Sequence, residues 1–215
     1  MDNIMQLILL LPVLLLSLSL HELSHGYASY MMGDPTAKNA GRLTLNPLAH
    51  LDPIGALVLL MTQRFGWAKP VPINPRYYNN PRRDMMLVSF AGPASNLALA
   101  AFFAIIINIM PLITGQSLMG LLYGMRGNTM IIVVNFLYLA IIINISLAIF
   151  NLLPFPPLDG SKILRGVLPP KYDRYFNKLE GPMGMLVILV LAYSGVLWSI
   201  IGPVVNGILN LLVFF

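Results

Sequence analysis

Two histidines and a glutamate lie close together inside the first long apolar segment of the chain. They belong to the pentapeptide HELSH at 21–25, which directly follows the apolar run at 4–20. A helix through this pentapeptide places His21 and His25 one turn apart on the same face, as in zinc sites of the HExxH type, and Glu22 where it can take a proton from a metal-bound water. Ionisable groups at membrane depth are costly, so this cluster predicts a functional site, namely metal-dependent hydrolysis.

A zinc hydrolase site usually has three protein ligands and an open position for water, so one more ligand is expected. The chain has no cysteine, and the ligand must therefore offer nitrogen or oxygen. Asp159 is the best-placed acid because it lies in an almost uncharged, proline-stiffened stretch, NLLPFPPLDG at 151–160. A simple Leu-Asp-Gly turn is the alternative interpretation of this aspartate. Other acids that remain in question are Asp34, Asp52 and Asp84.

Three further polar residues are candidates for roles near the reacting groups. Asn151, eight residues before Asp159, is a candidate hydrogen-bond donor to the oxyanion of a tetrahedral intermediate. His50 is a candidate substrate-binding residue, with metal ligation or a hydrogen bond to Asp52 as alternatives. Asn96 is a second candidate for substrate binding, although hydrogen bonds between helices explain most asparagines in apolar spans. The asparagines in such spans are Asn96, Asn108, Asn135, Asn144 and Asn151.

The composition predicts an all-α polytopic membrane protein, with 1–215 as a single membrane-embedded domain. Hydrophobic residues make up 57% of the chain and charged residues 10%, and the mean hydropathy is +0.77. The first apolar run lacks the basic start of a secretory signal, so we expect it to stay in the protein. Four spans are predicted, at 4–32, 85–112, 130–153 and 183–201. The tail at 204–215 is too short to span and is expected to lie at the interface or to pack back.

Two short segments between the first and second spans are predicted to be something other than full spans. The apolar run at 54–61 has only eight residues and is flanked by prolines and glycines, which favours a re-entrant or interfacial element. The segment at 67–73 alternates in polarity and contains prolines, which favours an edge strand.

The basic residues predict the orientation of the chain in the membrane. They gather in two loops, whereas the loop between the second and third spans holds only Arg126. The positive-inside rule then places both basic loops in the cytoplasm and the N-terminus outside, and it accounts for the net charge of +5 without nucleic-acid binding. The first and third spans both run inward, so His21, His25 and Asp159 arrive at a similar depth near the cytoplasmic side. The basic loop residues are Lys38, Arg42, Arg64, Lys69, Arg76, Arg82 and Arg83, then Lys162, Arg165, Lys171, Arg174 and Lys178.

Together these motifs resemble the site-2 protease family of intramembrane zinc metalloproteases. The matching segments are HELSH at 21–25, RLTLNPLAHLDP at 42–53, WAKPVP at 67–72, GPASN at 92–96 and NLLPFPPLDG at 151–160. The resemblance implies one Zn²⁺ held by His21, His25 and Asp159, with Glu22 as general base. It also implies a three-helix catalytic core with GPASN on the middle helix, and single-span transmembrane proteins or peptides as substrates. A substrate would unwind locally and pair with the segment near 67–73. We expect a minimal member without a PDZ or CBS domain.

Two other functions use the same histidine pair. A metal transporter would need polar groups continuing across the membrane, but the far halves of these spans contain mostly Ile, Leu and Val. An inactive scaffold with structural zinc would have no use for Glu22. Both fit the sequence less well than a protease does.

Overall fold

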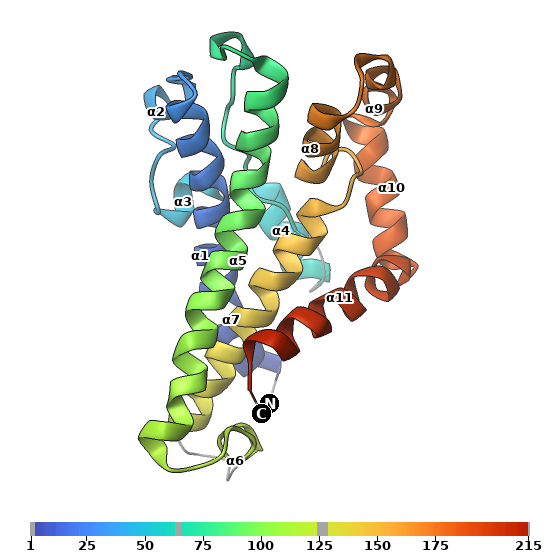
Figure 1. Ribbon diagram of the computed structural model, residues 1–215. Coiled ribbons are helices and arrows are strands. Elements are labelled where there is room, and N and C mark those ends of the chain that lie inside the picture. The colour runs from blue at the N-terminus through green and yellow to red at the C-terminus, as the bar shows by residue number, and fades with distance from the viewer. Residues whose placement is uncertain (1–2, 63–65, 124–128, 215) are drawn as a thin grey trace.

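The computed structural model describes residues 3–62, 66–123 and 129–214, and every regular element within them is a helix. Figure 1 shows the arrangement. The long helices are α1 (Asn3–Met31), α5 (Pro81–Thr114), α7 (Thr129–Leu152) and α11 (Val196–Leu212). The shorter ones are α2 (Thr36–Asn39), α3 (Pro47–His50), α4 (Pro53–Thr62), α6 (Leu118–Tyr123), α8 (Asp159–Val167), α9 (Asp173–Leu179) and α10 (Pro182–Tyr193), with 3₁₀ turns at Pro75–Tyr77 and Pro170–Tyr172.

Three helices, α1, α5 and α7, are long and apolar enough to cross a membrane, so the chain is a multi-pass membrane protein. The boundaries of α5 follow local sequence signals. Its N-cap is Asn80, whose side chain accepts from the Arg83 N–H, and Pro81 occupies the first turn. The helix ends at Gly115, which adopts a left-handed conformation with φ of 69°.

These three helices pack against one another and form the core of the molecule, as predicted (Figure 1). α5 runs antiparallel to α1 and α7, and α6 joins α5 to α7 at one end of the bundle. The helices that follow α1 and α7, among them α2, α3, α8 and α9, gather at the opposite end. Arg64 and Arg126 lie outside the described residues, and the other basic residues predicted to lie in loops belong to this second end or to its connections.

The predicted fourth span differs from the structure. Instead of one helix over 183–201, the chain forms α10 and α11, separated at Ser194 and Gly195, where Gly195 has φ of 80°. α10 also meets the preceding segment, Pro170–Leu179, at a bend of 71°. Counting this bent pair as one span gives up to four membrane-length helices, which agrees with the predicted fold class.

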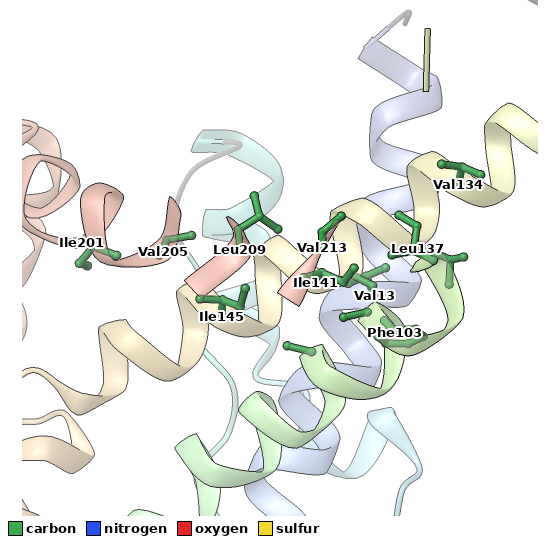
Figure 2. Close-up of a cluster of buried hydrophobic side chains, with 14 of the residues drawn as sticks. Val13, Phe103, Val134, Leu137, Ile141, Ile145, Ile201, Val205, Leu209 and Val213 are labelled. Carbon is green, nitrogen blue, oxygen red and sulfur yellow. The ribbon is translucent and has the colours of Figure 1, made fainter. Parts of the chain in front are cut away.

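The C-terminal helix packs back onto the bundle, one of the two outcomes expected for the tail. Leu197, Ile201, Val205 and Leu209 recur every four residues along α11 and are all buried. Figure 2 shows this face against the apolar side chains of the bundle, with Val213 near Val13. Asn108 on α5 fixes the end of α11, because its amide nitrogen donates to Leu212 O (2.7 Å) and its oxygen accepts from Phe214 N (3.1 Å).

The predicted edge strand at 67–73 is wrong as a strand. In the part of the chain that the structure describes, this segment makes one isolated antiparallel bridge, between Leu51 and Ala68, next to a hydrogen bond from Lys69 N to His50 O (2.8 Å). The next donor on this side of the segment, the N–H of Val71, bonds Glu22 instead of continuing the ladder, and Pro70 and Pro72 offer no N–H on the other side. The apolar run at 54–61 forms α4, a ten-residue helix. Its re-entrant or interfacial position stays a prediction.

Candidate metal centre

Three ligand-type side chains from distant parts of the sequence meet at the loop-rich end of the bundle. His21 Nε2 and His25 Nε2 on α1 are 3.0 Å apart, and they lie 3.2 and 3.0 Å from Asp159 Oδ2 at the start of α8. All three residues are buried, with exposed fractions of 6%, 7% and 6%. Helical spacing places the two imidazoles on one face of α1, and the turn after α7 brings the carboxylate to them.

The hydrogen bonds behind the histidines determine which ring nitrogen faces the centre with a lone pair. His25 Nδ1 donates to the main-chain oxygen of Val88 on α5 (2.7 Å), because a carbonyl only accepts. His21 Nδ1 donates to Asn96 Oδ1 (2.6 Å). In each neutral ring the proton is therefore on Nδ1, and Nε2 points a lone pair at the other histidine and at Asp159.

A buried polar network extends from His21 across three helices. Asn96 Nδ2 donates to Ser17 O (3.2 Å) and to Asn144 Oδ1 (2.9 Å), so its oxygen is the atom that faces His21. Asn144 Nδ2 in turn donates to Ser17 Oγ (2.8 Å). The side chains of Ser17, Asn96 and Asn144 are fully buried and satisfied by one another. The network therefore joins α1, α5 and α7 at the depth of the site and fixes the tautomer of His21.

The arrangement fits a small divalent cation. Two imidazole lone pairs and a carboxylate oxygen within 3.2 Å of one another repel unless a positive charge lies among them. A tetrahedral zinc ion with bonds of about 2.0–2.1 Å places its ligand atoms roughly 3.4 Å apart, close to the separations here. Among the described residues, the possible ligand atoms of these three side chains all lie within 4.8 Å of one another, which is close enough to share one metal ion. The predicted convergence of the three residues is present, and zinc ligation by them stays a prediction.

The second oxygen of Asp159 faces a cation on its own helix. Lys162 Nζ lies 3.4 Å from Asp159 Oδ1. This ammonium group favours the ionised form of Asp159, which is the form that a metal ligand needs.

Gly92, the first residue of the GPASN segment, allows α5 to approach the two imidazoles. A Cβ atom at this position would collide with the rings of both His25 and His21. The small residue that the sequence places one turn before Asn96 is therefore required by the space that the histidines occupy.

Glu22, the predicted general base, points toward the segment at 67–73. Its Oε2 accepts a hydrogen bond from the main-chain N–H of Val71 (2.8 Å). Glu22 follows His21 directly in the helix, and its carboxylate lies beside the centre rather than in the cluster of three ligand atoms. Its catalytic role stays a prediction.

The other predicted site residues lie outside the cluster, and each has a protein partner. Asn96 has no exposed surface, and its hydrogen bonds position His21 rather than offer an atom to a substrate. Asn151 Nδ2 donates to Leu147 O, one turn back in α7 (2.9 Å). His50 is buried, and its Nε2 lies 2.8 Å from Thr44 O.

The alternative of a bond between His50 and Asp52 is not found among the described residues: His50 bonds Thr44 O, and Asp52 Oδ1 accepts from Gly55 N in the first turn of α4 (2.8 Å). The interhelical role expected for the asparagines holds for Asn96, Asn108 and Asn144. Asn135 and Asn151 instead bond carbonyls of their own helix.

Sequence reasoning missed the structural role of Asp34, just after α1. This fully buried carboxylate accepts from Ser29 Oγ (2.8 Å), from the N–H and hydroxyl of Thr36, and from Asn74 N (2.7 Å). Burial alone raises the pKa of Asp34, but these hydrogen bonds outweigh it and lower the pKa below the ordinary value. Burial raises the pKa of the neighbouring Tyr78, whose hydroxyl lies 2.7 Å from Ser29 Oγ. The only feature of the sequence that indicates this role is the turn-forming Gly33-Asp34-Pro35.

Comparison with known proteins identifies the family. The profile of Peptidase family M50 matches residues 9–192. The chain is 39% identical to "Putative zinc metalloprotease YwhC" of Bacillus subtilis (strain 168) over 206 residues, 94% of this chain and 90% of that protein. It is 29% identical to "Putative zinc metalloprotease Rip2" of Mycolicibacterium smegmatis over 86% of this chain and 66% of that protein. It is 32% identical to "Putative zinc metalloprotease Rip3" of Mycobacterium tuberculosis (strain H37Rv) over 56% of this chain and 28% of that protein.

No solved structure matches the chain. The match to the family profile covers most of the chain, including the HELSH and LDG segments that form the candidate metal centre. It confirms the resemblance to site-2 proteases drawn from the sequence motifs. The chain belongs to Peptidase family M50, and it is a zinc metalloprotease of the membrane.

Proposed function

We propose that this protein hydrolyses a peptide bond within or next to the transmembrane segment of membrane-anchored substrates. The substrates would be single-span transmembrane proteins or peptides, and one domain covering 1–215 would carry the activity with one Zn²⁺ per chain. The observation that carries this proposal is the convergence of His21, His25 and Asp159 beside Glu22 at one end of a membrane-length helix bundle.

In this mechanism His21, His25 and Asp159 would hold the ion, and the hydrogen bonds from the two Nδ1 atoms keep both Nε2 lone pairs free for it. When bound, zinc supplies Lewis-acid chemistry that acidifies water and polarises the scissile carbonyl. Glu22 takes the proton from the attacking water and passes it to the leaving amine as the C–N bond breaks. Asn151 would donate to the developing oxyanion after its amide leaves Leu147 O.

The substrate helix must unwind before cleavage, because the amides of a helix are hydrogen-bonded and shielded. The extended segment at 67–73 supports pairing with an unwound substrate, since it lies beside Glu22 and already has an extended backbone. Its prolines limit such pairing to few N–H donors. His50 lies next to this segment but is buried, so it would contact the substrate only after the loop around it opens.

The active site is proposed to face the cytoplasm, with the N-terminus outside. Support comes from the gathering of basic residues at the end of the bundle that holds the site. Water would then reach Glu22 from the cytoplasmic side.

The test compares zinc content and proteolysis in wild type and Glu22→Gln, with a panel of single-span membrane proteins as substrates. Glu180→Gln is the matched control, because Glu180 is an exposed acid that pairs with Arg165. We expect about one zinc per chain in all three proteins and a loss of cleavage of at least about 100-fold in Glu22→Gln alone. Wild-type cleavage by a zinc-loaded Glu22→Gln protein would refute the role of Glu22. Zinc without cleavage in the wild type, for every substrate, would favour a structural or transport role.

A further inference from the structure

The segment KPVP at 69–72 offers a single main-chain donor between two prolines. Pro70 and Pro72 carry no N–H, so the N–H of Val71 is the only one within 70–72. This N–H is 2.8 Å from Glu22 Oε2. Pro70 fixes its own φ, and Val71 is restricted to extended conformations because a proline follows it. The two prolines therefore restrict the backbone conformation on both sides of this donor.

The surface of α1 is shaped to receive Val71. Gly26 lies one turn after Glu22 on the same face of the helix. A Cβ atom at Gly26 would be 3.0 Å from Val71 Cγ1 and 2.8 Å from Leu43 Cδ2. The glycine thus lets Val71, which is only 6% exposed, lie directly against the helix next to the general base.

Hydrogen bonds hold the segment on both sides of Val71. Before it, the main chain of Lys69 makes two hydrogen bonds. Its N–H donates to His50 O (2.8 Å), and its oxygen accepts from Arg42 Nη2 (2.7 Å). After it, Asn74 N donates to the buried carboxylate of Asp34 (2.7 Å). The donor at Val71 is therefore preorganised rather than a chance contact of a loop.

We infer that Val71 is a positioning residue for Glu22: its main-chain N–H holds Oε2 of the carboxylate and leaves the other oxygen to take the proton from water. This inference rests on the proposed base role of Glu22. A carboxylate on a flexible side chain samples several rotamers, and a misplacement of about 1 Å can lower a rate about 100-fold. The effect is on the orientation of the base, so it changes kcat and not zinc binding.

The test removes the N–H and keeps the rest of the segment. Val71→Pro deletes the donor, and Val71→Ala keeps it while shortening the side chain. A third protein carries an ester in place of the amide at Val71, introduced as the α-hydroxy acid of valine, which removes the N–H without a pyrrolidine ring. We expect kcat to fall about 10-fold to 100-fold in the proline and ester proteins and less than about threefold in Val71→Ala. Zinc content, KM and thermal unfolding should stay close to wild type in the ester protein.

Three results would overturn the inference: a wild-type kcat in the ester protein, a loss in Val71→Ala as large as in the ester protein, or a loss of kcat that follows loss of zinc or of folding. Glu22→Gln measured in parallel separates this inference from the proposed function. If Glu22→Gln cleaves at the wild-type rate, the base role fails and the inference fails with it. If Glu22→Gln is inactive while the ester protein is fully active, only the inference about Val71 fails.

Discussion

The two halves of the three-helix bundle are held together in different ways. In the half shown in Figure 2, α1, α5, α7 and α11 meet mainly through apolar side chains, including Val13, Phe103 and Ile141, and Asn108 adds two hydrogen bonds to the end of α11. In the other half, less than one turn along α7 from Ile141, the fully buried Asn144 begins the polar network that leads through Asn96 to His21.

Lipid tails are as apolar as leucine, so apolar contacts between membrane helices give close packing but little preference for one register. Hydrogen bonds between buried amides have defined partners and do select a register. The apolar half therefore keeps the helices together, whereas the polar half aligns them so that His21, His25 and Asp159 meet. Substitutions in the two halves should therefore affect different properties.

The largest effect is expected from Gly92→Ala, in the polar half. The added methyl group would collide with both imidazoles, which cannot move without breaking their bonds to Val88 and Asn96. We expect zinc affinity and proteolysis to fall at least about 10-fold, as for the loss of a residue that orients metal ligands. The measurement is zinc titration of the purified protein. Gly207→Ala is the control, because a Cβ atom there meets nothing within 4 Å. Normal zinc affinity in Gly92→Ala would contradict the packing described here.

A smaller effect, on stability alone, is expected from Ile141→Ala in the apolar half. Ile141 is fully buried, so its truncation leaves a cavity that costs about 2 kcal/mol of unfolding free energy. Ile132→Ala is the control on the same helix, because Ile132 is 42% exposed. Unfolding in mild detergent would measure the loss, and zinc content per folded protein should be unchanged. If Ile141→Ala lost zinc without losing stability, the two halves of the bundle would not have the different roles described here.

The smallest effect is expected from Asp34→Asn, which tests the anchor of the loops rather than the bundle. The lowered pKa of Asp34 means that its carboxylate stabilises the fold above the ordinary aspartate pKa of about 3.9, and that this stabilisation is lost as the pH falls through the folded-state pKa. Asparagine cannot accept all four hydrogen bonds, so we expect a loss of about 1–2 kcal/mol at pH 7. The difference in stability between wild type and Asp34→Asn should be constant above about pH 5 and shrink in more acidic solution. A stability difference that grows on acidification would contradict the lowered pKa of Asp34.

The sequence was sufficient for the family, the three membrane-length helices and the identity of the clustered residues. HELSH indicates its site by helical spacing within an apolar segment, and Asp159 by its place after a span that runs in the same direction as the first. The prediction missed the break at Ser194 and Gly195 because apolar runs lie on both sides of it, although a Ser-Gly pair is a turn signal. The edge strand was predicted from alternating polarity, which an extended proline-rich segment also has.

The information in residue types and their spacing is local: it tells which residues carry metal-ligand and acid–base chemistry, and which segments are apolar enough to cross a bilayer. The partners of those residues depend on how the chain folds. The bonds from His21 to Asn96, from His25 to Val88 and from Val71 to Glu22 join residues 75, 63 and 49 positions apart. One is a side-chain bond between helices. The other two use a main-chain oxygen, which every residue has, and a main-chain N–H, which every residue except proline has. Residue type therefore carries little information about them, and they follow from how the helices and the proline-rich segment pack.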